Sequence, residues 1–150
     1  MDLKYEFYIG GKPERVWNAL VSPEETKKIY YGSEIQSTFE VGSPLKYVGA
    51  GKDGKDTVHI HGKVLGFQPN KAFRHTYIVG ESYIAGHSKF EPRISYELEP
   101  FGECTKLTVT HDQWTEGDPS YEATAEGWWK LLCVLKTLIE TGKPLDLSVH

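Results

Sequence analysis

Two histidines of this chain alternate with apolar residues, as side chains on one face of a β-strand do. His75 stands two residues from both Phe73 and Tyr77, and His111 stands two residues after Val109. We therefore expect both imidazoles on apolar, inward strand faces. Our main expectation there is a core histidine that pairs with a tyrosine or a backbone carbonyl. The alternatives are a polar anchor in a ligand pocket and a general base, because histidine titrates near neutrality.

A second pair, His59 and His61, is separated by one residue in the segment "TVHIHGKVLGF". If this segment is a strand, both rings point to the same face, which we expect to be exposed to solvent. Two imidazoles could bind zinc, but a zinc site needs a third ligand and usually a fourth. The neighbouring sequence offers none, so we predict no metal site.

The glycine-rich segment "GAGKDGKD" at 49–56 resembles two nucleotide-binding motifs, GxGxxG and most of a P-loop. Both motifs bind phosphate only when the loop opens a helix whose first amides face the ligand. Here a predicted strand follows, and Asp56 stands where a P-loop has the Ser or Thr that binds magnesium. The segment is therefore predicted to be a hairpin turn, and we expect no nucleotide or other cofactor.

The sequence shows no pattern for nucleophilic catalysis. It has no GxSxG elbow, and Cys133 falls on the polar side of its predicted helix. Cys104 and Cys133 are too few for a disulfide framework, so we expect two free thiols. Glu97 and Glu99 alternate on one strand and indicate a solvated sheet surface. We therefore name no catalytic residue, and an enzyme is the less favoured interpretation.

The composition is that of an ordinary globular chain with many aromatic residues. The 150 residues suit one domain, and a net charge of −4 argues against a nucleic-acid partner. Aromatic residues make up 13% of the chain. No apolar run approaches the ~18 residues of a membrane span, and the N-terminus lacks the features of a signal peptide. We expect a cytoplasmic protein.

The predicted elements are a strand, two short helices, six strands and a long helix. Alternation predicts the first strand at 3–9. Pro13 suits the start of a helix, and Ser22 with Glu25 three residues later predicts a capping box on the next helix. Short connections indicate an antiparallel meander. Its strands are predicted at 34–39, 45–49, 58–67, 72–79, 90–99 and 105–112, and the last helix at roughly 120–141.

The two adjacent tryptophans of the last helix cannot both face the core. At 100° per residue, Leu132 and Leu135 lie close to Trp128, whereas Trp129 lies near Lys130. We predict that Trp128 faces inward and that Trp129 lies on the flank. One helix is only ~10 Å wide, and seven strands at ~4.8 Å spacing are much wider. The sheet must curl around the helix, and this geometry favours a cavity.

Three segments carry a resemblance to a known family: "PERVWNALVSPEETKKIYYG", "ISYELEPFGECTKLTVTH" and "GWWKLLCVLKTLIETGKPL". Together they resemble the family named for the activator of the heat-shock-protein-90 ATPase, in the START / birch-pollen-allergen superfamily. The resemblance covers essentially the whole chain. It implies a single domain over 1–150 with the α+β helix-grip fold, in which a curved seven-stranded antiparallel sheet wraps around the C-terminal helix. It also implies an internal pocket, which in relatives often holds a lipid, a polyketide or another hydrophobic molecule.

We therefore expect noncovalent binding of a small hydrophobic or amphipathic molecule between the last helix and the sheet. One alternative is an enzyme that uses a cavity histidine as acid or base, and another is a chaperone-associated interaction module. We expect a monomer or a homodimer. The predicted pocket residues are Phe73, His75, Tyr77, Tyr96, Val109, His111, Trp114, Trp128, Leu132 and Leu135, with Tyr83, Ile84 and Tyr121 at the mouth.

Overall fold

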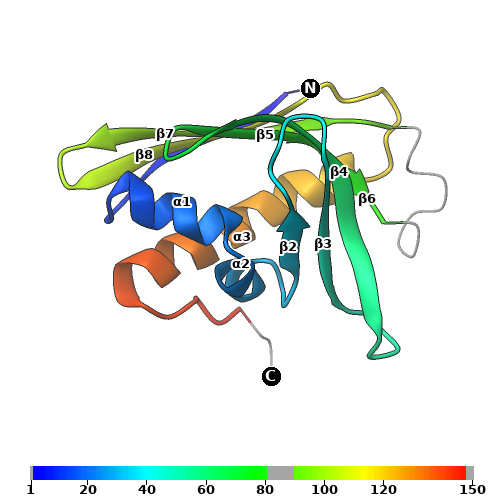
Figure 1. Ribbon diagram of the computed structural model, residues 1–150, viewed down its shortest axis with the longest axis horizontal. Helices are drawn as coiled ribbons and strands as arrows, with labels where there is room; N and C mark the ends of the chain where they lie inside the picture. The colour runs from blue at the N-terminus through cyan, green and yellow to red at the C-terminus, as the bar shows by residue number, and fades with distance from the viewer. Residues whose placement is uncertain (1, 81–89, 148–150) are drawn as a thin grey trace.

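The computed structural model describes residues 2–80 and 90–147 and has the predicted α+β architecture. Strand β1 is followed by two short helices, a series of strands and a long C-terminal helix (Figure 1). The elements are β1 (Leu3–Ile9), α1 (Pro13–Val21), α2 (Pro23–Ile29), β2 (Glu34–Ser37), β3 (Pro44–Ala50), β4 (Asp56–Gln68), β5 (Ala72–Thr76), β6 (Ile78–Val79), β7 (Arg93–Phe101), β8 (Cys104–Asp112) and α3 (Tyr121–Thr141).

The strands form one antiparallel sheet in the order β1-β8-β7-β5-β4-β3-β2, and the short β6 pairs with β4. Apart from β6, successive strands are neighbours from β2 to β8, and β1 adds to the far side of β8. Figure 1 shows the sheet bending so that β7 and β8 cover the helices on one side, while β3 and β4 run along another. The predicted curved sheet around the C-terminal helix is confirmed.

The segment predicted as one strand at 72–79 is divided at Tyr77. The backbone N–H of Tyr77 donates to the carbonyl of Pro92 at 2.8 Å, and β6 then pairs with β4 alone. The chain passes very close to β4 here, because a Cβ at Gly62 would lie 2.0 Å from the carbonyl oxygen of Thr76. A glycine at this position is therefore what allows the sheet to turn its corner.

Alternation places the core side chains as predicted on the last strand and the last helix. On β8, Leu107, Val109 and His111 are fully buried. On α3, Trp128 is buried with the leucines that follow it, whereas 60% of the Trp129 surface is exposed. The question of which tryptophan faces the core is thus settled in favour of Trp128.

The predicted capping box on α2 does not form. Ser22 is the residue before the helix, but its hydroxyl makes no capping hydrogen bond. In a capping box the glutamate accepts from the N–H of the cap residue. That N–H already donates to the carbonyl of Asn18, because Ser22 also ends α1. Glu25 therefore pairs with Arg15 of α1 instead, at 3.4 Å.

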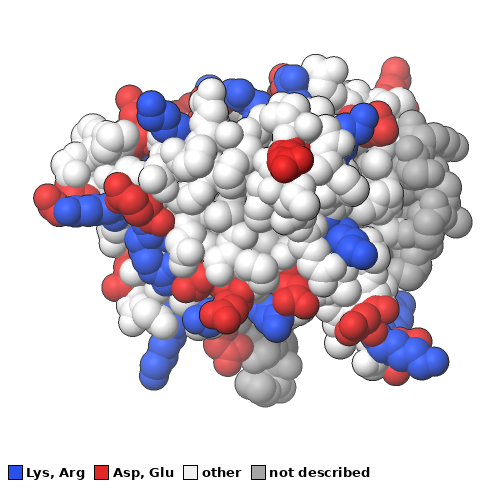
Figure 2. All heavy atoms as spheres, in the orientation of Figure 1, with Lys and Arg blue, Asp and Glu red and all other residues white. Residues whose placement is uncertain are grey.

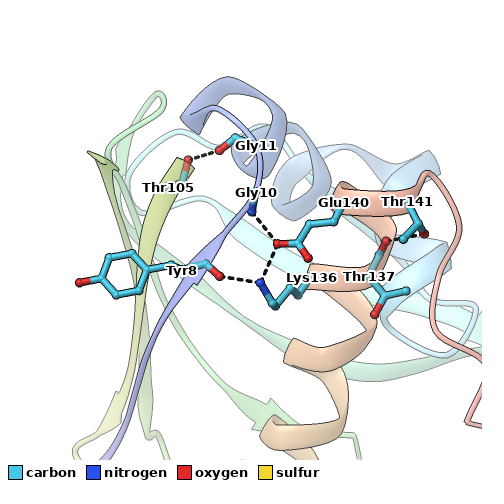
Figure 3. Close-up of polar contacts among 8 residues, drawn as sticks. All are labelled: Tyr8, Gly10, Gly11, Thr105, Lys136, Thr137, Glu140 and Thr141. Atoms are coloured by element: carbon cyan, nitrogen blue, oxygen red, sulfur yellow. Dashed lines mark hydrogen bonds and ion pairs between the residues drawn. The ribbon is translucent and has the colours of Figure 1, made fainter. Parts of the chain in front are cut away.

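The end of α3 is fastened to the end of β1 by a small polar cluster (Figure 3). The Lys136 ammonium donates to the carbonyl of Tyr8 at 2.9 Å and to the Glu140 carboxylate at 2.6 Å. The same carboxylate accepts from the N–H of Gly10 at 2.7 Å. These bonds hold the helix against the edge strand and so fix its position across the sheet.

Charged side chains of both signs lie mainly around the rim of the face shown in Figure 2, with an uncharged area between them. This face therefore offers no basic patch of the kind that binds a phosphate backbone. Within residues 2–80 and 90–147, no helix has the length and apolar character that crossing a membrane would require.

Candidate ligand-binding pocket

A pocket of about 690 Å³ lies between the first half of α3 and the β3–β4 side of the sheet. The segment after α2 and the short strand β6 complete its wall. Its lining residues are Tyr30, Tyr31, Ser33, Tyr47, Ala50, His59, Ile60, Tyr77, Val79, Pro119, Ser120, Ala123, Thr124, Gly127, Trp128 and Leu131.

The pocket exists because α3 presents small side chains to the sheet in its first half. Ala123, Thr124 and Gly127 line the pocket from the helix, and a Cβ at Gly127 would meet nothing within 4 Å. Further along the helix, Leu132 and Leu135 are buried against the sheet. The inward side of the helix thus leaves space at one end and packs closely at the other.

The described lining of the pocket contains no Asp, Glu, Lys or Arg. Its polar side chains are tyrosines, serines, one threonine and the half-buried His59. Such a wall can offer hydrogen bonds to a ligand but no fixed carboxylate or ammonium charge. The chemistry of the pocket therefore suits an uncharged molecule.

Three buried tyrosine hydroxyls meet at the inner wall of the pocket. Tyr30 and Tyr96 share a hydrogen bond between their hydroxyls, and the rings of Tyr30 and Tyr47 lie 4.7 Å apart. Burial raises the pKa of each of these three phenols well above its ordinary value. They are therefore neutral at physiological pH. The Tyr47 hydroxyl has no hydrogen bond of acceptable geometry within the described residues.

His75 is fully buried and has a defined tautomer. Its Nδ1 lies 2.7 Å from the carbonyl oxygen of Thr76. A carbonyl can only accept, so Nδ1 carries the proton and Nε2 is left as an acceptor. Burial lowers the pKa of His75 to about 4, against the smaller opposing effect of the Thr76 carbonyl. The ring is therefore neutral at pH 7.

His111 has the opposite tautomer, because its partner is a donor. The indole Nε1 of Trp128 lies 3.0 Å from His111 Nδ1 and can only donate. The proton of the neutral ring is therefore on Nε2. Burial and, to a smaller extent, the proximity of His75 lower the pKa of His111 to about 3, against the opposing effects of Asp112 and Asp118.

Two of the residues predicted for the pocket, Tyr77 and Trp128, line it. Seven others lie in the core behind this lining, and they are Phe73, His75, Tyr96, Val109, His111, Leu132 and Leu135. Trp114 and Tyr121 contact each other edge to face at 4.9 Å near the start of α3 and are not part of the lining. The remaining two, Tyr83 and Ile84, lie outside the described residues.

Sequence reasoning missed the pocket wall formed by Tyr30, Tyr31 and Tyr47, as well as Gly127. Tyr47 alternates with the buried Leu45 on β3, so its inward position could have been predicted from the sequence. Tyr30 and Tyr31 follow a short helix, where no period extends far enough to indicate their direction.

The prediction that His59 and His61 share one solvent-exposed face is wrong. In the β3–β4 ladder, Tyr47 pairs with Ile60 and Val48 with Val58, so His59 is the extra residue of a β-bulge. A bulge shifts the alternation by one residue. His59 therefore lines the pocket, whereas His61 lies in a separate groove on the other side of the bulge. Within the described residues, no three His, Cys, Asp or Glu side chains are grouped as a metal site requires.

A family model matches residues 11–140, and its description is "Activator of Hsp90 ATPase homolog 1-like protein". No curated protein sequence matches the chain.

Many solved structures have the same fold. One is the solution structure of the Aha1 dimer from Colwellia psychrerythraea, whose sequence is 25% identical to this chain. The two structures superpose with a TM-score of 0.71, and the match covers 95% of this chain and 98% of that chain. A crystal structure of a protein from Mesorhizobium loti is 18% identical, with a TM-score of 0.74 over 93% of this chain and 97% of that chain. A solution structure of a protein from Cytophaga hutchinsonii is 21% identical, with a TM-score of 0.74 over 95% of both chains.

Proposed function

Because the chain belongs to the family of Activator of Hsp90 ATPase homolog 1-like proteins, we propose that it binds a small, uncharged, hydrophobic or amphipathic molecule in the pocket beside α3. The observation that carries this proposal is the lining, which is aromatic and aliphatic with neutral hydroxyls. A volume of about 690 Å³ also lies within the usual range of ligand pockets.

The alternative of acid–base catalysis by His75 or His111 has less support. Neither His75 nor His111 lines the pocket, and their pKa values of about 4 and about 3 make both rings weak bases at neutral pH. A binding role requires neither contact with the reacting atoms nor a basic imidazole. We therefore propose binding without proton transfer by these two residues.

Filling the pocket from the helix tests the proposal. In Gly127→Leu the new side chain would enter the open space beside Gly127, and leucine is a good helix former. The control is Glu126→Leu, which places a leucine side chain at the neighbouring exposed position, outside the pocket lining. Binding of Nile red, an uncharged solvatochromic dye, is measured by fluorescence for both variants and for the unchanged protein.

We expect the unchanged protein and Glu126→Leu to bind the dye equally, and Gly127→Leu to bind it at least about tenfold more weakly. Mass spectrometry of the freshly purified protein, under native and then denaturing conditions, is expected to show a bound molecule that is lost on denaturation. Equal dye binding by all three proteins, with no such molecule, would overturn the proposal.

A second candidate function is self-association, which the exposed Trp129 favours. Its indole contacts Tyr5 of the edge strand β1 edge to face at 4.7 Å, and 60% of its surface is accessible. One relative of this chain was solved as a dimer. Sedimentation equilibrium of the unchanged protein and of Trp129→Lys is expected to show a dimer that the substitution dissociates. An unchanged protein that remains a monomer at high concentration would exclude this function.

A further inference from the structure

Two buried polar atoms behind the pocket wall have no hydrogen-bond partner among the described residues. They are Nε2 of His75 and Nε2 of His111. Both side chains are fully buried. Buried polar groups in native proteins are almost always paired, so two unpaired nitrogens in one region require an explanation.

The two histidines lie in one row across the sheet, immediately behind the pocket. His75 is opposite Ile94, which is in turn opposite His111, so both imidazoles project from the same face. The ring of Tyr77, which lines the pocket, lies 6.5 Å from the His75 ring and 4.8 Å from the His111 ring. Trp128 lines the pocket as well and binds His111. A single layer of aromatic rings therefore separates the pocket from both unpaired nitrogens.

The two nitrogens have opposite hydrogen-bonding character. The Thr76 carbonyl leaves Nε2 of His75 as an acceptor, and the Trp128 indole leaves Nε2 of His111 as a donor. A group that satisfies both must accept one hydrogen bond and donate another. A hydroxyl can do this, whereas an ether or ketone cannot donate and an ammonium cannot accept.

The surroundings also disfavour an anion. No Lys or Arg lines the described pocket, both histidines are neutral at pH 7 because burial lowers the pKa of each, and Asp112 and Asp118 lie close enough to His111 to act on its pKa. A carboxylate in this place would be desolvated without a counter-charge, which is strongly unfavourable. Since an ammonium cannot accept from Nε2 of His111, the polar end of the ligand is neutral.

We infer that the ligand has a hydroxyl group on an apolar body, such as a phenol, an alcohol or a sterol, and that this hydroxyl bridges the two histidines. It accepts from Nε2 of His111 and donates to Nε2 of His75, after the Tyr77 ring has turned aside. This movement replaces the contacts of the Tyr77 ring with His111 and Trp128, at 4.8 and 6.4 Å, and leaves the backbone hydrogen bond of Tyr77 to Pro92 in place. The inference rests on the proposed function, because it assigns the polar end of the same ligand.

A matched series of probes tests this inference by isothermal titration calorimetry at pH 7. Naphthalene has the apolar body alone, naphthol adds a hydroxyl, methoxynaphthalene adds an acceptor only, and naphthoate adds a carboxylate. Two hydrogen bonds predict that naphthol binds about 5–50-fold more tightly than naphthalene or methoxynaphthalene. Naphthoate is expected to be the weakest of the four.

The variant His75→Phe removes the acceptor and keeps an aromatic ring in the core. We expect this variant to bind naphthalene as before and to lose most of the difference in affinity between naphthol and naphthalene. The control His61→Phe, outside the pocket, should keep that difference. Nitrogen NMR of the imidazoles provides a second measurement on the unchanged protein. It should show the proton of His75 on Nδ1 and that of His111 on Nε2, and naphthol should shift both Nε2 signals.

The outcomes separate the inference from the proposed function. If none of the four probes binds, the proposed function fails and the inference fails with it. If naphthalene and naphthol bind equally, or naphthoate binds best, the pocket is a binding site but the hydroxyl inference is overturned. It is also overturned if naphthol leaves both Nε2 signals unchanged, because its hydroxyl then lies elsewhere. Should His75→Phe fail to fold, the NMR measurement decides.

Discussion

Acidification should destabilise this protein through its two buried histidines. Burial lowers the pKa of His75 from 6.5 to about 4 and that of His111 from 6.5 to about 3. In the unfolded chain both rings return to the ordinary value. Between pH 6.5 and 4 the unfolded state therefore binds more protons than the folded state. The free energy of unfolding must then fall as the pH is lowered through this range.

The magnitude follows from proton linkage. At pH 5 each unfolded histidine binds nearly one proton more than the folded one, which corresponds to about 1.4 kcal/mol per pH unit for each residue. Integrated from pH 7 to pH 5, each histidine lowers the free energy of unfolding by roughly 2 kcal/mol, or about 4 kcal/mol together. This is a large part of the ~5–15 kcal/mol that stabilises a typical domain.

Urea denaturation at pH 7, 6 and 5 measures the effect, with His75→Phe as the test variant and His61→Phe as the control. The unchanged protein and His61→Phe should lose stability with nearly the same pH dependence. His75→Phe cannot bind the extra proton at this position, so its loss between pH 7 and pH 5 should be smaller by roughly 2 kcal/mol. If the free energy of unfolding falls with pH equally in His75→Phe and in the unchanged protein, His75 is not a buried neutral ring and the reasoning is refuted.

Three further predictions concern stability at pH 7, each measured by urea denaturation. Gly127→Ala should stabilise the protein by about 0.5–1 kcal/mol, because the site is helical and the added methyl has space; a loss of stability would mean that the space is filled. Trp128→Phe should lower the free energy of unfolding by about 2–3 kcal/mol, because it leaves Nδ1 of His111 without its hydrogen-bond donor and removes buried apolar area. A decrease below ~1 kcal/mol would contradict this hydrogen bond. Gly62→Ala should cost at least about 1–3 kcal/mol, because its Cβ would overlap the carbonyl of Thr76; a neutral result would contradict the close approach of β5 to β4.

Local periodicity predicted the parts of this fold that depend only on local geometry. Strand alternation placed Val109 and His111 inward, and helical phase placed Trp128 inward and Trp129 on the flank. These positions follow from the 2.0 and 3.6 periods of regular backbone, which hold wherever an element is uninterrupted. They therefore required no knowledge of what packs against the strand or the helix.

Alternation failed where the curvature of the whole sheet changes the backbone. The bulge at His59 brings that ring to the pocket, and the break at Tyr77 ends the regular pairing of β5. Both irregularities lie where the sheet turns its corner beside Gly62. A bend of this kind depends on contacts between strands rather than on the alternation of one strand. A glycine inside a strand, such as Gly62, marks such a bend but does not show how the alternation shifts around it.

The position of the pocket depends on which part of the space between helix and sheet is filled. At one end, Trp17 of α1, Phe67 of β4 and Phe73 of β5 pack against one another with ring centres 5.1–6.3 Å apart and occupy that space. At the other end, Ala123 and Gly127 leave it open. Because one helix is too narrow to cover the sheet, unfilled volume between them could be expected from the sequence. The end at which this volume lies could not, because it depends on where the large aromatic residues of three separate elements meet. The small residues of α3 are the signal that could have decided it, since Gly and Ala fill little of the volume that a closely packed interior requires.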